Sequence, residues 1–155
     1  MTTHDGAVTA RIAAPPSAVF DLITALDRLP EWNAHIDHIV ERSADPAEGV
    51  EWVVEIRAMG THWNSRSRVQ ELDRDTLRFA HISQSDDGNP SFALWTWQGT
   101  PAEEGAAITV NWQLNPRTFW RRALFARIRH RQLKNEVSVS IAAAERVLAV
   151  GRARA

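Results

Sequence analysis

Apolar and polar residues alternate through the middle of the chain, from Val50 to Leu114. Side chains two residues apart lie on the same face of a strand, so each alternating run predicts a strand with one apolar face. The alternation is cleanest in the last run, where Thr109, Asn111 and Gln113 separate the apolar residues. The residues predicted to share the inward face are Val50, Trp52, Val54 and Ile56; Trp63, Ser65, Ser67 and Val69; Leu77, Phe79, His81 and Ser83; Ala93, Trp95 and Trp97; and Ile108, Val110, Trp112 and Leu114.

Turn signals separate these runs and predict an antiparallel meander. Gly60 marks one turn, and residues 73–76, 85–90 and 99–105 are predicted as further connections. The segment 99–105 is predicted to be a loop because glycine stands at both of its ends.

The two ends of the chain carry helical patterns. Weaker signals near the N-terminus predict a strand over 8–13, a helix from Pro16 to about Asp27, a short helical piece over 29–33 and a strand over 36–42. Beyond the meander, apolar residues at intervals of three and four predict one long helix from Pro116 to about Val150.

These elements predict an α+β fold. We expect a twisted antiparallel sheet of about seven strands wrapped around the long C-terminal helix, with two short helices after the first strand. A length of 155 residues fits one domain over 1–155, with a structured core from about 8 to 150.

The tryptophans add a possible site to this picture. The chain has seven tryptophans and no tyrosine. Five of the tryptophans are in phase with the inward face, so that face is either a heavily aromatic core or the wall of a cavity for a flat apolar ligand. Trp32 and Trp112 are predicted to be mainly structural, whereas Trp63, Trp95 and Trp97 are the best candidates to touch a ligand.

Charge and composition exclude several classes of function. The net charge is −1, which gives no electrostatic case for nucleic acid. The chain has no cysteine, so disulfides, a thiol nucleophile and thiolate metal sites are excluded. No signal peptide and no membrane-spanning apolar stretch is visible, which favours a cytoplasmic protein without integral membrane association.

The order and spacing of several short motifs resemble the polyketide cyclase/dehydrase branch of the START-like (SRPBCC) superfamily, which has the helix-grip fold. The matching segments are 14–20, 29–32, 67–72, 95–97, 108–112 and 133–136. The resemblance covers residues from about Val8 to Leu148, and it implies a deep cavity between the sheet and the C-terminal helix. It implies no catalytic set, because members of the superfamily include aromatase/cyclases and carriers of lipids and hormones.

Polar residues on the inward face are the candidates for chemistry, because a buried polar group without a partner costs about 1–3 kcal/mol. His81 is a candidate general acid or base near neutral pH, and Ser65 and Ser67 are candidates to hold a carbonyl oxygen. The alternative is that His81 only bonds a backbone carbonyl or orders a water. The predicted ligand-binding residues are Trp52, Trp63, Phe79, Trp95, Trp97, Trp112 and His130.

Two further features are candidate sites. His35 and His38 form an HxxH pair across a predicted helix-to-strand junction, so helical ligand spacing does not apply and no metal site or other cofactor is predicted. The start of the final helix is basic, from Arg117 to Lys134. It is either a solvated face or a dock for one of three partners: an acidic protein such as an acyl-carrier protein, a ligand carboxylate or phosphate at the cavity mouth, or a membrane surface.

Two functions remain open from the sequence. The first is the binding of a small apolar molecule, aromatic or polycyclic, in a tryptophan-lined cavity. The second is a cofactor-independent cyclase or dehydratase, in which His81 is the acid/base and the serines bind oxygen.

Overall fold

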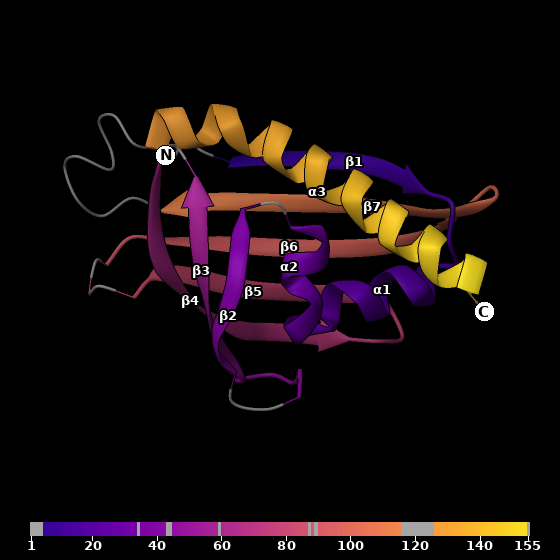
Figure 1. The fold of residues 1–155 in the computed structure, drawn as a ribbon, viewed down its shortest axis with the longest axis horizontal. Helices are drawn as coiled ribbons and strands as arrows, with labels where there is room; N and C mark the ends of the chain where they lie inside the picture. Colours follow the sequence, from indigo (N-terminus) through magenta and orange to yellow (C-terminus); the bar gives the residue numbers. More distant parts are fainter. Residues whose placement is uncertain are drawn as a thin grey trace.

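The computed structural model describes residues 5–33, 35–42, 45–58, 60–86, 88, 90–115 and 126–154, with the backbone alone for 58, 126–131 and 150–154. Seven antiparallel strands form one sheet with the order β1-β7-β6-β5-β4-β3-β2 (Figure 1). The strands are β1 (Asp5–Ile12), β2 (Ile36–Arg42), β3 (Glu51–Ala58), β4 (Thr61–Asp73), β5 (Arg78–Ser85), β6 (Phe92–Ala102) and β7 (Gly105–Asn115).

The helices lie together on one face of this sheet (Figure 1). They are α1 (Pro16–Thr24), the 3₁₀ turn η1 (Leu26–Arg28), α2 (Leu29–Trp32) and α3 (Ala126–Arg154). Pro16 suits the first turn of α1, since its fixed φ is helical and its missing N–H would have no partner there. The predicted α+β architecture, with seven strands and a long C-terminal helix, is confirmed.

Buried side chains from both layers meet between the sheet and the helices. Helix α3 contributes a stripe of buried residues at intervals of three and four: Leu133, Val137, Ile141 and Ala144. The backbone N–H of Ala13 donates to Glu145 Oε2 at 2.9 Å, which ties α3 to the segment after β1. The helix is therefore held against the sheet by an apolar stripe and by a polar contact.

The loop predicted over 99–105 is wrong. Strand β6 continues to Ala102, and β7 begins at Gly105 directly opposite it. Only Glu103 and Glu104 form the turn, and Glu104 takes a left-handed φ of 64°. Gly105 is needed because a Cβ there would overlap the carbonyl oxygen of Ile12. This glycine marks close packing inside a strand, not a loop.

Several other boundaries differ from the predicted ones. The first strand begins at Asp5 instead of residue 8, because pairing with β7 extends to Gln113. Helix α1 ends at Thr24, before the expected Asp27, and the chain continues as the 3₁₀ turn η1. Helix α3 continues past Val150 to Arg154, and the predicted helical segment 116–125 lies outside the described residues.

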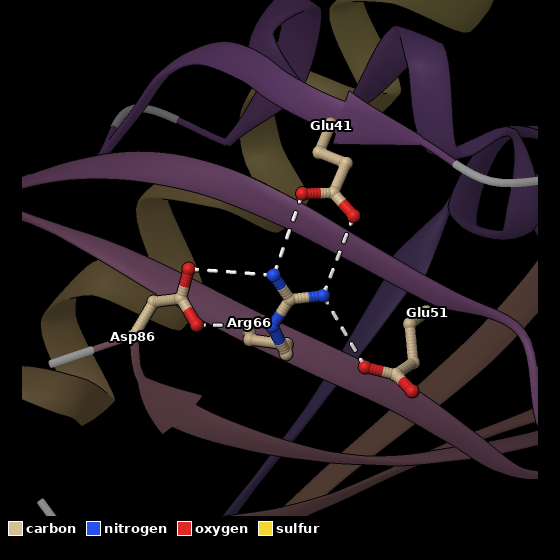
Figure 2. A network of polar contacts seen from close by, with 4 residues as sticks. All are labelled: Glu41, Glu51, Arg66 and Asp86. Atoms are coloured by element: carbon tan, nitrogen blue, oxygen red, sulfur yellow. Dashed lines mark hydrogen bonds and ion pairs between the residues drawn. The ribbon is translucent and has the colours of Figure 1, made fainter. Parts of the chain in front are cut away.

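The opposite face of the sheet carries a network of ion pairs around Arg66 (Figure 2). The Arg66 guanidinium lies 2.9 Å from Asp86, 3.3 Å from Glu51 and 3.4 Å from Glu41. Val53, which is directly opposite Arg66 in the register of β3 and β4, is only 1% exposed. Arg66 thus links β2, β3, β4 and the segment after β5 on the face away from the helices.

Candidate functional site

A cavity lies between the helices and the central strands. Its volume is about 210 Å³, well above the roughly 10–15 Å³ that one water needs by this measure. Five tryptophans and two phenylalanines line it: Trp32, Trp52, Trp63, Trp95, Trp97, Phe79 and Phe92. Helix α3 closes one side with Leu133, Glu136, Val137 and Ser140.

The register of the sheet brings the predicted polar residues together. Ser67 is paired with Trp52 on one side and with Ser83 on the other. His81 is paired with Val69 and with Trp95 in the next row. Ser65, Ser67 and His81 all line the cavity, as their inward phase predicts.

His81 is surrounded by aromatic rings. The ring centroids of Trp52 and Phe79 lie 5.3 Å and 5.2 Å from its centroid, and Trp95 stacks on it at 6.4 Å. The indole N–H of Trp97 donates to His81 Nε2 at 3.3 Å. Because Nε2 accepts this bond, the proton of the neutral ring is on Nδ1. Nδ1 is buried and has no partner among the described residues.

These surroundings keep the His81 ring uncharged. Burial lowers the pKa of His81 to about 3, although the residue retains some accessible surface on the cavity side. A general base is most effective when its pKa lies near the working pH. The geometry therefore favours a neutral hydrogen-bonding ring over the acid/base role that the sequence suggests.

Ser65 and Ser67 are each 4% exposed. Within the described part of the chain, neither hydroxyl has a hydrogen-bond partner. Ser83 differs from them, since its Oγ accepts a bond from Trp95 Nε1 at 3.3 Å. Two hydroxyls on the cavity floor can therefore bond a ligand without breaking a bond within the protein.

The predicted aromatic residues separate into two groups. Trp52, Trp63, Phe79, Trp95 and Trp97 line the cavity, and Trp32 joins them by packing edge-on against Trp97 at 5.6 Å. Trp112 is 1% exposed and is not among the lining residues. Its ring lies over Gly6 of β1, where a Cβ would overlap Trp112 Cζ2.

Several polar residues of the cavity are not predicted from the sequence, and two of them, His35 and Glu136, lie close together. His35 Nδ1 lies 3.0 Å from the carbonyl oxygen of Arg57, and His35 Nε2 lies 3.6 Å from Glu136 Oε1. Glu136 is 8% exposed. Glu136 lies on the same helix face as Leu133 and Ser140, which also line the cavity.

The HxxH pair does not converge. His35 lines the cavity, whereas His38 is exposed and bonds Asp37 at 2.9 Å. Asp37, His38 and Glu55 offer ligand atoms within 4.8 Å of one another, but Arg57 lies 2.9 Å from Glu55 and 3.4 Å from Asp37. An exposed cluster that already binds a guanidinium is unlike a zinc site.

Two other predicted features cannot be placed. The side chain of His130 lies outside the described residues, as do residues 117–125 and the side chains of Arg127, Arg129 and Arg131 in the basic segment. Among the described residues, no helix is long and apolar enough to cross a membrane.

Comparison with solved structures shows the same fold. Protein TTHA0849 from Thermus thermophilus is similar with a TM-score of 0.73 and 21% identity over 94% of this chain and 98% of that chain. Ara h 8.0201 has a TM-score of 0.74 and 15% identity over 95% of this chain and 98% of that chain. The di-domain ARO/CYC StfQ from the steffimycin biosynthetic pathway has a TM-score of 0.76 and 15% identity, over 97% of this chain and 52% of that chain.

Sequence comparison identifies the family. No curated protein matches the chain. The family model described as polyketide cyclase/dehydrase and lipid transport matches residues 3–149, which agrees with a helix-grip fold whose cavity lies between the sheet and α3. The chain therefore belongs to the polyketide cyclase/dehydrase and lipid transport family of START-like proteins.

Proposed function

We propose that this protein binds a small apolar molecule, aromatic or polycyclic, in the cavity between the sheet and α3. The observation that carries the proposal is the concentration of aromatic side chains around the cavity, with five indoles and two phenyl rings. Burial of apolar ligand surface against such rings is favourable by about 25 cal/mol per Å². The hydroxyls of Ser65 and Ser67 add hydrogen bonds that orient the ligand.

A titration with an uncharged fluorescent probe, N-phenyl-1-naphthylamine, tests this proposal. We expect saturable binding with quenching of tryptophan emission. Ser67→Leu extends a side chain into the cavity and should weaken binding by about tenfold or more. Gln70→Leu is the matched control, because Gln70 is exposed on the same strand and faces away from the cavity. Absence of saturable binding to the wild type would refute the proposal.

A cyclase or dehydratase activity is the second candidate function. The pair of unpartnered hydroxyls at Ser65 and Ser67 favours it, because two donors on a cavity floor can hold a carbonyl oxygen on which negative charge develops. The lowered pKa of His81 argues against His81 as the acid/base of such a reaction.

Turnover of a β-polyketone thioester separates the two functions. If His81 transfers a proton in the reaction, His81→Gln should slow turnover by roughly 10²–10⁴-fold. If the protein is a binding module, no turnover is detected and the same variant binds the naphthylamine probe within a few-fold of the wild type. Turnover at an unchanged rate in His81→Gln would remove His81 from the mechanism.

A further inference from the structure

Two indoles of β6 donate hydrogen bonds to β5 in the same diagonal direction. Trp95 Nε1 lies 3.3 Å from Ser83 Oγ, and Trp97 Nε1 lies 3.3 Å from His81 Nε2. Trp95 is paired with His81 and Trp97 with Phe79, so each acceptor is two residues beyond the partner of its tryptophan. Diagonal neighbours on one face are within reach of an aromatic side chain. Because an indole has one donor, neither tryptophan can donate to a ligand without losing its bond to β5.

The bond from Trp95 leaves the Ser83 hydroxyl with an unused hydrogen. Ser83 Oγ accepts from the indole, and in the part of the chain that the structure describes Ser83 makes no other hydrogen bond. A hydroxyl has one hydrogen to donate and two lone pairs. Ser83 is half-buried and lines the cavity, so the acceptor for this hydrogen can belong to a ligand.

Ser67 lies next to Ser83 on the cavity floor. The two residues are directly paired on β4 and β5, which places their Cβ atoms roughly 4.5–5.5 Å apart on one face. Ser65, two residues along β4, is about 6.6 Å from Ser67. Ser67 is 4% exposed and has no partner among the described residues. An oxygen placed between Ser67 and Ser83 can therefore accept a bond of about 2.8 Å from each hydroxyl.

We infer that Ser83 is a specificity-determining residue of this cavity: the Trp95 indole positions its hydroxyl, which donates beside Ser67 to an oxygen of the ligand. The inference rests on the proposed binding function and adds the chemical group that the ligand presents to β4 and β5, an oxygen that accepts hydrogen bonds, as in a ketone. A hydrocarbon of the same shape leaves both hydroxyls without a partner. Trp95 is then a positioning residue that acts through Ser83, besides lining the cavity.

The probes that test the inference are 1-acetonaphthone and 1-ethylnaphthalene, which share a ring and a two-carbon substituent and differ in the carbonyl oxygen. By isothermal titration, Ser83→Ala should weaken the ketone by about fivefold and leave the hydrocarbon within about twofold. Trp95→Phe should lower the ratio of ketone to hydrocarbon affinity in the wild-type background and lower it no further in Ser83→Ala. Ser138→Ala, at an exposed position on α3, is the matched control and should change neither affinity.

The carbonyl stretch of the bound ketone gives a readout in the wild type itself. It should lie at a lower wavenumber than in cyclohexane, because hydrogen bonds to the oxygen weaken the C=O bond. Ser83→Ala should move the band part of the way back, which a purely structural role of Ser83 would not do. A band at its cyclohexane position in the wild-type complex would overturn the inference without any variant.

The outcomes separate this inference from the proposed function. If neither compound binds the wild type, the cavity is not an apolar binding site and both statements fail. If both bind and Ser83→Ala changes their affinities by the same factor, Ser83 does not set specificity while the binding function stands. If Trp95→Phe lowers the affinity ratio equally in both backgrounds, Trp95 does not act through Ser83 and its positioning role is overturned.

Discussion

At the scale of single residues, His81 shows how surroundings set protonation. Trp97 donates to Nε2, and aromatic rings exclude water from Nδ1. Burial lowers the pKa of His81 from the ordinary value of 6.5 to about 3, so the ring stays neutral in the folded protein at any pH well above that value. Between these two values the unfolded chain binds a proton that the folded chain does not, so the stability contributed by neutral His81 decreases as the pH falls.

This difference predicts a pH effect on folding. Between pH 7 and pH 5, the free energy of unfolding of the wild type should fall by up to about 2 kcal/mol more than that of His81→Gln. Glutamine keeps an acceptor for Trp97 but does not titrate. Urea denaturation at both pH values measures the difference, and His62→Gln, at an exposed position, is the control. Equal pH slopes for wild type and His81→Gln would show that burial does not perturb His81.

Gly6 supports Trp112 through the absence of a side chain. A Cβ at Gly6 would overlap the Trp112 ring, so Gly6→Ala should reduce the free energy of unfolding by about 1–3 kcal/mol through overpacking. Gly99→Ala is the matched control, because its Cβ would lie 3.4 Å from Leu77 Cβ, an ordinary contact. Chemical denaturation measures both variants, and equal stabilities for the two would contradict the proposed packing.

The sequence predicts the inward phase of Ser65, Ser67 and His81 because a strand has a period of two residues, which depends on no other part of the chain. It does not predict that Trp112 packs over Gly6. That contact depends on the pairing of β1 with β7, and the paired residues are about a hundred positions apart in the sequence. Trp112 is thereby kept from the cavity that the neighbouring Trp95 lines.

At the scale of elements, Arg66 on β4 forms ion pairs with three other segments of the sheet. Its three carboxylate partners come from β2, β3 and the segment after β5 (Figure 2). Hydrogen bonds that the Arg66 guanidinium donates to Asp86 and Glu41 raise the pKa of Arg66 above its ordinary range. Each exposed pair contributes little by itself, but removal of the shared guanidinium leaves three carboxylates close together.

Arg66→Gln should therefore lower the free energy of unfolding by about 1 kcal/mol at low salt. The loss should shrink as sodium chloride is added, because salt screens the repulsion among the carboxylates. Arg68→Gln on the same strand is exposed and should stay within about 0.5 kcal/mol of the wild type. A loss for Arg66→Gln that does not depend on salt would point to lost packing over Val53 instead.

Element types were more predictable than element ends. The strands of the meander and the apolar stripe of α3 follow from local periodicity. The hairpin at Glu103–Glu104 did not, because Gly99 and Gly105 resemble loop glycines in sequence, while in the structure they lie within paired strands. Glu136 was overlooked for a related reason: a charged residue in a helix is usually solvated, and only the docking of α3 shows that this one lines the cavity.

At the scale of the whole molecule, the cavity couples binding to stability. A ligand that binds only the folded chain raises the free energy of unfolding by about 2.7 kcal/mol at a concentration of 100 times its Kd. N-phenyl-1-naphthylamine at that concentration should therefore raise the Tm by roughly 5–10 °C. Calorimetry measures the shift, and Ser67→Leu at the same probe concentration should show almost none. An equal shift in both proteins would place the probe outside the cavity.

The strand order also has a kinetic consequence. Five of the six strand pairs join neighbours in sequence, whereas the sixth joins β1 to β7 across the whole meander. Closing a loop of that length has the largest entropy cost in the sheet, so we expect β1 to join late in folding. Helix α3, which closes one side of the cavity, contacts β1, so the cavity is then incomplete in the folding transition state. A bound ligand should accordingly slow unfolding and leave the folding rate almost unchanged.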